Sequence, residues 1–232
     1  MNIEPSHFEK NMDISANIRD YLKDRLPVRR YSSFDYCFNY FSDFYERDNI
    51  EAIANPTNVQ LSCLQLGFYL ASWGMFRGRA FLLQKSAKHY QPLISVIAEM
   101  PKVCWKIDLD TYSDKSISLL LEIYKHISGS LGDDDEYASP TLVTKVMLGV
   151  FGNVPALDDN FCKGIGFSKY FSKSLLRRIS DYYQANKEEF GRHRIKTIDF
   201  STEMETDRYY TKAKLIDMVG FIEGLKMSNK PA

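Results

Sequence analysis

The sequence has few cysteines and histidines, with four of each in 232 residues. The cysteines lie far apart in apolar surroundings, which is typical of buried free thiols in a reducing compartment. Their positions are Cys37, Cys63, Cys104 and Cys162. The histidines are isolated from one another and from the cysteines, so the spacings of metal sites are missing. We therefore expect a cytoplasmic protein without a metal centre.

Other absences exclude further classes of protein. Lys plus Arg and Asp plus Glu are equal, at 30 each, so the formal net charge is zero. A neutral chain is not expected to coat nucleic acid nonspecifically, although the net charge does not exclude a local basic groove. No apolar run reaches the about 20 residues that span a bilayer, and no signal peptide pattern is present. The phosphate-binding loop, the dinucleotide fingerprint and the G-x-S-x-G motif are missing, so no cofactor is expected.

Apolar residues at helical spacing are what the sequence does have. Hydrophobic residues make up 44% of the chain, including 15 Phe and 15 Tyr, which is enough for a sizeable core. Residues 33–47 place their aromatic side chains on one helical face, and residues 59–71 are apolar almost all round, as in a central helix. We predict an all-α protein with eight to ten helices in one compact domain. A division into two lobes, residues 1–100 and 101–232, is left open.

Some stretches are harder to assign. Residues 80–90 continue a helical pattern, and residues 169–190 predict one long amphipathic helix. The last helix is predicted over 207–225. Residues 101–113 fit either a short strand or an extended connection. The capping box at residues 6–9 predicts a helix start, and the acidic run 133–136 predicts a solvated loop.

The first candidate site lies between residues 139 and 166. A helix predicted over 140–151 ends at a Gly/Pro loop, and either Asp158 or Asp159 begins the next helix. An Asp at the start of a helix commonly caps it, by accepting hydrogen bonds from the free backbone N–H groups of the first turn. The two interpretations are that capping is its only role, or that one Asp caps while the other faces a cleft as a general base.

The run V-M-L-G-V-F-G-N-V-P-A-L-D-D-N-F-C-K-G-I resembles the segment after the hairpin in helix-hairpin-helix base-excision DNA glycosylases. The resemblance implies an all-helical, two-lobed glycosylase, with Gly152 and Pro155 in the loop and Asp159 or Asp158 as the catalytic aspartate. Asp159 fits the spacing from Gly152 slightly better. The hairpin of the family is not matched, and neither is the lysine of its bifunctional members. Lys145 lies three residues further along and is expected to line the same cleft.

The second candidate site is the run W-G-M-F-R-G-R at residues 73–79. Glycine lets a ligand approach the backbone, arginine binds phosphate and tryptophan stacks on bases. Trp73, Arg77 and Arg79 are therefore candidates for nucleic-acid binding. The alternative is a kink between core helices, with the arginines in surface ion pairs. Arg192 and Arg194 form a basic turn that would extend a phosphate-binding groove if it lay near Arg77.

These signals favour a protein that recognises DNA, RNA or a nucleotide, with glycosylase-like hydrolysis by Asp159 or Asp158. The alternative is a non-catalytic helical protein that binds a protein partner, for example an immunity-type module. The two hypotheses differ in one geometric expectation. Only the enzyme requires Trp73, Arg77, Lys145 and Asp159 to meet at one cleft.

Overall fold

The computed structural model describes residues 12–132 and 137–229. Within these ranges the chain forms ten α-helices, short 3₁₀ helices and one two-stranded antiparallel sheet. The predicted all-α fold class is therefore confirmed. The capping box at residues 6–9 and the acidic run 133–136 lie outside the described residues.

The α-helices begin and end close to capping residues in the sequence. In chain order they are α1 (Ile14–Lys23), α2 (Ser33–Glu46), α3 (Val59–Ser72), α4 (Gln91–Glu99), α5 (Asp114–Leu131), α6 (Pro140–Phe151), α7 (Asp159–Ile165), α8 (Lys173–Ala185), α9 (Lys187–Gly191) and α10 (Lys212–Ser228). The strands are β1 (Lys196–Ile198) and β2 (Glu205–Tyr209). The 3₁₀ helices are Arg30–Ser32, Ile50–Ala54, Phe81–Gln84, Ala87–Tyr90, Lys102–Lys106 and Leu109–Thr111.

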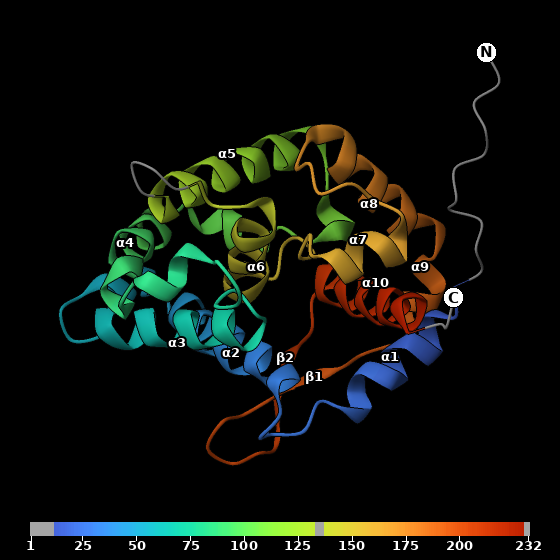
Figure 1. Cartoon of the computed structure of the whole chain (residues 1–232), viewed down its shortest axis with the longest axis horizontal. Coiled ribbons are helices and arrows are strands. Elements are labelled where there is room, and N and C mark those ends of the chain that lie inside the picture. The colour runs from blue at the N-terminus through green and yellow to red at the C-terminus, as the bar shows by residue number, and fades with distance from the viewer. Residues whose placement is uncertain (1–11, 133–136, 230–232) are drawn as a thin grey trace.

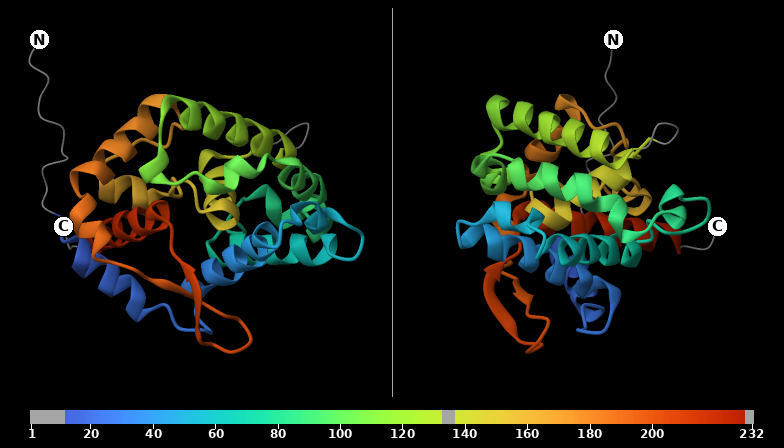
Figure 2. Two further views of the ribbon diagram at one scale, coloured as in Figure 1. Left: turned by 180° about the vertical axis from the view of Figure 1, so that it is seen from behind. Right: turned by 90° about the vertical axis from the view of Figure 1, so that its left-hand side faces the viewer.

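Helix α6 lies near the middle of the molecule (Figure 1) and packs against α2, α3 and α5. Helix α7 runs alongside α10, and α1 also packs on α10, so the first and last helices of the described chain are neighbours. The β1–β2 hairpin projects from the body beside α2 (Figures 1 and 2). This arrangement brings the end of α3, the middle of α6 and the start of α7 towards α10.

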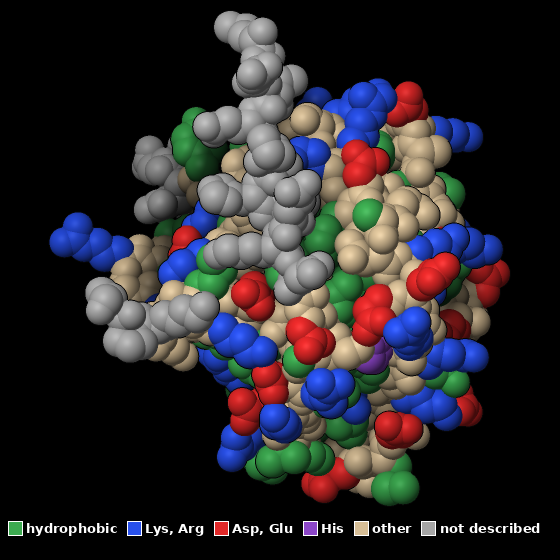
Figure 3. Space-filling view, turned by 90° about the vertical axis from the view of Figure 1, so that its right-hand side faces the viewer, with side chains coloured by type: hydrophobic (Ala, Val, Ile, Leu, Met, Phe, Trp, Pro, Cys, Tyr) green, Lys and Arg blue, Asp and Glu red, His purple; other side chains and the backbone are tan. Residues whose placement is uncertain are grey.

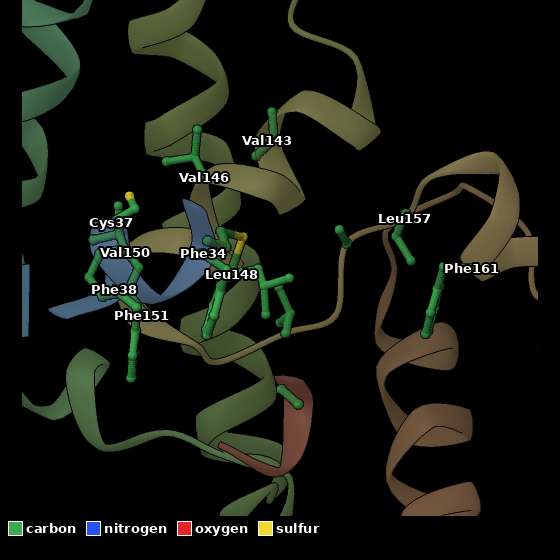
Figure 4. Close-up of a cluster of buried hydrophobic side chains, with 14 of the residues drawn as sticks. Phe34, Cys37, Phe38, Val143, Val146, Leu148, Val150, Phe151, Leu157 and Phe161 are labelled. Atoms are coloured by element: carbon green, nitrogen blue, oxygen red, sulfur yellow. The ribbon is translucent and has the colours of Figure 1, made fainter. Parts of the chain in front are cut away.

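The core is built around α6, because every residue from Leu142 to Phe151 is buried. Val146 and Val150 of α6 lie close to Phe34 and Cys37 of α2 (Figure 4). Tight packing at Gly149 brings α3 close, since a Cβ atom there would lie 2.4 Å from the ring of Tyr69. The central helix predicted over residues 59–71 is wrong in one respect: α3 is buried at Leu66 and Leu70, but it lies at the surface, with Leu61, Leu64 and Phe68 exposed.

Four stretches differ from their predicted structure. Residues 80–90 form two 3₁₀ helices instead of one α-helix, and the strand suggested for residues 101–113 is wrong, since two further 3₁₀ helices lie there. The long helix predicted over 169–190 begins later and is divided, because Asn186 leaves helical geometry with φ −118° between α8 and α9. The final helix starts at Lys212 because residues 205–209 pair with β1.

None of the helices within residues 12–132 and 137–229 has both the length and the apolar character needed to cross a membrane.

Candidate functional site

The loop between α6 and α7 is held in place by contacts with α6 and α10. Helix α6 ends at Gly152, whose φ of 64° is in the left-handed region that favours glycine. The backbone N–H of Leu157 donates to the hydroxyl of Thr144 on α6 at 2.9 Å. The backbone N–H of Ala156 donates to the carboxylate of Asp217 on α10 at 3.0 Å. The loop therefore delivers the next residue, Asp158, to a fixed position at the start of α7.

Asp158 uses its two carboxylate oxygens for two different contacts. Oδ1 accepts a hydrogen bond from the backbone N–H of Phe161 at 2.9 Å, which caps α7. Oδ2 accepts a hydrogen bond from Nζ of Lys145 on α6 at 3.0 Å. The Lys145 side chain is 3% exposed, whereas that of Asp158 is 17% exposed. The lysine therefore lies behind the carboxylate, and only the carboxylate reaches solvent.

Trp73, the residue that ends α3, lies against this ion pair. Nζ of Lys145 is 5.0 Å from the centre of its ring, within the range of a cation–π contact. A second buried lysine, Lys214 of α10, is 5.4 Å from the same ring and forms a 2.8 Å ion pair with Asp217. We call these five residues, Trp73, Lys145, Asp158, Lys214 and Asp217, the lysine–aspartate cluster.

Arg30 adds a third cation beside Trp73, whose ring is buried and stacks on Tyr31 with ring centres 5.5 Å apart. Its guanidinium lies 5.7 Å from the centre of the Trp73 ring and 5.2 Å from that of Tyr31. No carboxylate of the described residues lies within ion-pair distance of Arg30. Three cations, Lys145, Lys214 and Arg30, therefore face two carboxylates, Asp158 and Asp217. The local excess of one positive charge favours an anion beside Trp73.

An open groove of about 760 Å³ starts at this point and runs along α3. We call it the aromatic groove. It is lined by Pro27, Val28, Arg29, Arg30, Ser33, Tyr36, Leu64, Gln65, Phe68, Tyr69, Ser72, Phe200 and Glu203. Tyr69 of α3 lines the groove but is itself buried, and burial, together with the charges of Asp217 and Asp158, raises the pKa of its hydroxyl.

Of the sequence-predicted site residues, the structure brings together Trp73, Lys145 and Asp158. Asp159 points elsewhere: its side chain is 92% exposed and pairs with Lys169 at 2.5 Å. The slight preference for Asp159 over Asp158 is therefore not supported by the geometry. Arg77 is exposed and turns back on its own segment, with Nε 3.5 Å from the carbonyl oxygen of Gly74.

The other predicted basic residues have contacts of their own. Arg79 is exposed and no contact joins it to the cluster among the described residues. Arg192 pairs with Glu189 at 2.7 Å, and Arg194 lies over the ring of Tyr209, 4.5 Å from its centre. The face of the molecule that carries α8 and α9 shows Lys and Arg interspersed with Asp and Glu (Figure 3). Among the described residues seen in Figure 3, the basic side chains do not gather into one continuous groove.

Three residues of the site were not predicted from the sequence: Arg30, Lys214 and Asp217. For the last two, the signal is a Lys and an Asp three residues apart in α10, where they are buried among apolar neighbours. Charged residues are seldom fully buried unless they are paired, so their position inside an apolar run is informative. For Arg30 the sequence offers only its place in a connection between helices.

No group of three His, Cys, Asp or Glu side chains that could hold a metal ion occurs in the described part of the chain. Comparison of the chain with protein-family models, with curated proteins and with solved structures finds no match.

Proposed function

We propose that this protein binds a nucleotide of a nucleic acid beside Asp158 and hydrolyses its N-glycosidic bond, with Asp158 as the catalytic carboxylate. The observation that supports this most directly is the Lys145–Asp158 pair, in which the lysine is buried and the aspartate side chain is partly exposed. A carboxylate stabilises the positive charge that develops on a sugar when its bond to the base breaks.

In this reaction the bond between C1′ of the sugar and the base nitrogen breaks, and the oxygen of water bonds to C1′. Asp158 takes a proton from that water, and the leaving base takes up a proton from solvent. Lys145 is a positioning residue, since it holds Oδ2 of Asp158 at 3.0 Å. The unpaired guanidinium of Arg30 lies where it can hold the adjacent phosphate.

The test is base release from labelled oligonucleotides that contain uracil, alkylated or oxidised bases, scored as alkali-labile abasic sites. Asp158→Asn should lower the rate at least about 100-fold, in the range of general acid–base catalysis, while oligonucleotide binding is retained. Asp159→Asn is the matched control, because that side chain is exposed and outside the cluster. Base release by Asp158→Asn at the rate of the unmodified protein would contradict the proposal.

One observation favours the alternative of a non-catalytic helical protein. Both oxygens of Asp158 already accept hydrogen bonds, one from the backbone of Phe161 and one from Lys145. A carboxylate used in this way stabilises the start of α7 and the contact between α6 and α7 without any substrate. This alternative predicts that no oligonucleotide of the panel loses a base and that Asp158→Asn lowers only the free energy of unfolding.

A further inference from the structure

The aromatic groove carries unusually exposed apolar side chains. Phe68 on α3 is 73% exposed, Phe200 in the β1–β2 loop is 72% exposed, and Val28, which also lines the groove, is 92% exposed. Single exposed apolar residues are common on protein surfaces, but several around one hollow indicate a binding site. Two of these three side chains are aromatic rings.

The ring of Phe200 is held in place by its neighbours. It packs edge-on against Tyr36 of α2, with ring centres 5.0 Å apart and planes at 82°. The hydroxyl of Tyr36 donates to the carbonyl oxygen of Pro27 at 2.8 Å, which fixes the second ring as well. The groove thus has an ordered aromatic wall before any ligand arrives.

The loop that presents Phe200 is also rigid by construction. The carboxylate of Asp199 accepts hydrogen bonds from the backbone N–H groups of Ser201 and Thr202, at 3.1 and 2.8 Å. Glu203 completes the turn in the left-handed region, with φ 58°, which non-glycine residues rarely adopt. A binding loop that is ordered in advance loses less conformational entropy when its ligand binds.

Arg208 of β2 fixes the hairpin to α2. The guanidinium of Arg208 pairs with Asp43 at 2.8 Å and with Glu46 at 2.7 Å. The side-chain amide of Asn39 donates to the carbonyl oxygen of Ile198 at 2.9 Å. Phe200 and Phe68 therefore belong to one rigid frame formed by the hairpin, α2 and α3.

Three charged residues line the groove, Arg29, Arg30 and Glu203, and Arg30 is the cation among them that can meet a phosphate. Arg29 pairs with Asp24 at 2.6 Å, whereas Arg30 has no carboxylate partner among the described residues. Arg30 lies at the end of the groove that meets Trp73. Aromatic rings followed by an unpaired arginine match the bases and the phosphate of a nucleotide strand.

We propose that the aromatic groove binds an unpaired, single-stranded segment of nucleic acid, next to the nucleotide bound beside Asp158. Bases of this segment stack on Phe68 and Phe200, and Arg30 binds the phosphate between groove and cluster. Stacking requires bases whose faces are free, which excludes paired bases of a duplex. The volume of about 760 Å³ is the size of a small-ligand pocket and suits a short stretch of single strand. This assignment rests on the proposed function for its neighbouring site.

The experiment is fluorescence anisotropy with a labelled oligothymidylate and with a duplex of matched length. Phe68→Ala and Phe200→Ala should each weaken single-strand binding about 5- to 100-fold, which is the affinity lost when one base no longer stacks on an aromatic ring. The unmodified protein should bind the duplex more weakly than the single strand. Tyr170→Ala is the matched control, because its ring is 76% exposed and lies outside the groove. Thermal unfolding of each variant checks that the fold is retained.

The outcomes separate the two proposals. If base release occurs but neither Phe68→Ala nor Phe200→Ala weakens single-strand binding, the groove assignment is wrong and the proposed function stands. If single-strand binding depends on both rings but no oligonucleotide loses a base, the groove assignment stands and the glycosylase proposal fails. Absence of oligonucleotide binding altogether overturns the groove assignment and points to a polypeptide as its occupant.

Discussion

Asp35 is a fully buried carboxyl group on α2, and Arg25 is the cation 3.7 Å away. Burial raises the pKa of Asp35 to about 7, although the charge of Arg25 acts in the opposite direction. The folded protein therefore keeps a proton on Asp35 that the unfolded chain releases near pH 4. The stabilisation from this proton is fully present below pH 4 and is lost as the pH rises to about 7.

The pH dependence gives a residue-scale prediction. Asp35→Asn replaces the carboxyl by a neutral group at every pH, so its free energy of unfolding should rise relative to the unmodified protein between pH 5 and pH 8. The expected relative gain is about 2–3 kcal/mol, from roughly 1.4 kcal/mol per pH unit. Urea unfolding at both pH values measures it. Asp24→Asn, with an exposed side chain, should show no such gain. An equal difference for Asp35→Asn at both pH values would show that Asp35 is ionised throughout.

Individual site residues were predictable only where the signal is local. The position of Asp158 at the start of α7 follows from the Gly/Pro loop before it, since capping depends on a few neighbouring residues. The choice between Asp158 and Asp159 depends on how the loop is held, and Asp217 holds it from 61 residues further along the chain. Sequence spacing contains no information about such a distant hydrogen bond.

Helix α7 crosses α10 so closely that only glycine fits at the contact. A Cβ atom at Gly224 would lie 1.9 Å from the carbonyl oxygen of Asn160, and one at Gly164 would lie 2.0 Å from that of Gly220. These neighbours are backbone atoms and cannot move without shifting a helix. Because Asp158 caps α7, the crossing also sets the position of the Asp158 carboxylate relative to α6.

The crossing gives a prediction at the scale of elements. Gly224→Ala should lower the free energy of unfolding by about 2–3 kcal/mol, as overpacking of a tight contact does. Gly129→Ala is the matched control: Gly129 is also helical, has nothing within 4 Å of its added Cβ, and should gain about 0.5–1 kcal/mol. Urea unfolding compares the two. Similar stability of both variants would mean that α7 can shift along α10 at little cost.

The elements themselves were predicted best where capping residues bound an apolar pattern. Ser139 with Pro140 begins the helix predicted over 140–151, because the cap and the first turn are read from adjacent residues. Residues 80–90 have the same apolar spacing but form 3₁₀ helices, since packing over α3 and α4 decides their geometry. Periodicity cannot separate these two outcomes for short segments.

At the scale of the whole molecule, the zero net charge is distributed as local pairs. Arg177 pairs with Asp114 across α8 and α5, and Lys196 pairs with Asp207 across the hairpin. The composition predicted this balance but not which cations have no ion pair in the described residues, and Arg30 is one of several. Arg30 is unpaired among the described residues because it lies over aromatic rings, where no carboxylate of the fold reaches it.

This charge distribution predicts a weak salt dependence of single-strand binding. Each phosphate contact contributes a slope of about −0.7 to the plot of log affinity against log salt concentration. With Arg30 as the main phosphate contact, the slope should be close to −1. Arg30→Gln should bring it close to zero, whereas Phe68→Ala should weaken binding without changing the slope, because stacking releases no counterions. The measurement is anisotropy titration at several salt concentrations. A slope steeper than about −3 would require several more phosphate contacts, and the basic residues Arg77, Arg79, Arg192 and Arg194 would then have to be tested as a second nucleic-acid surface.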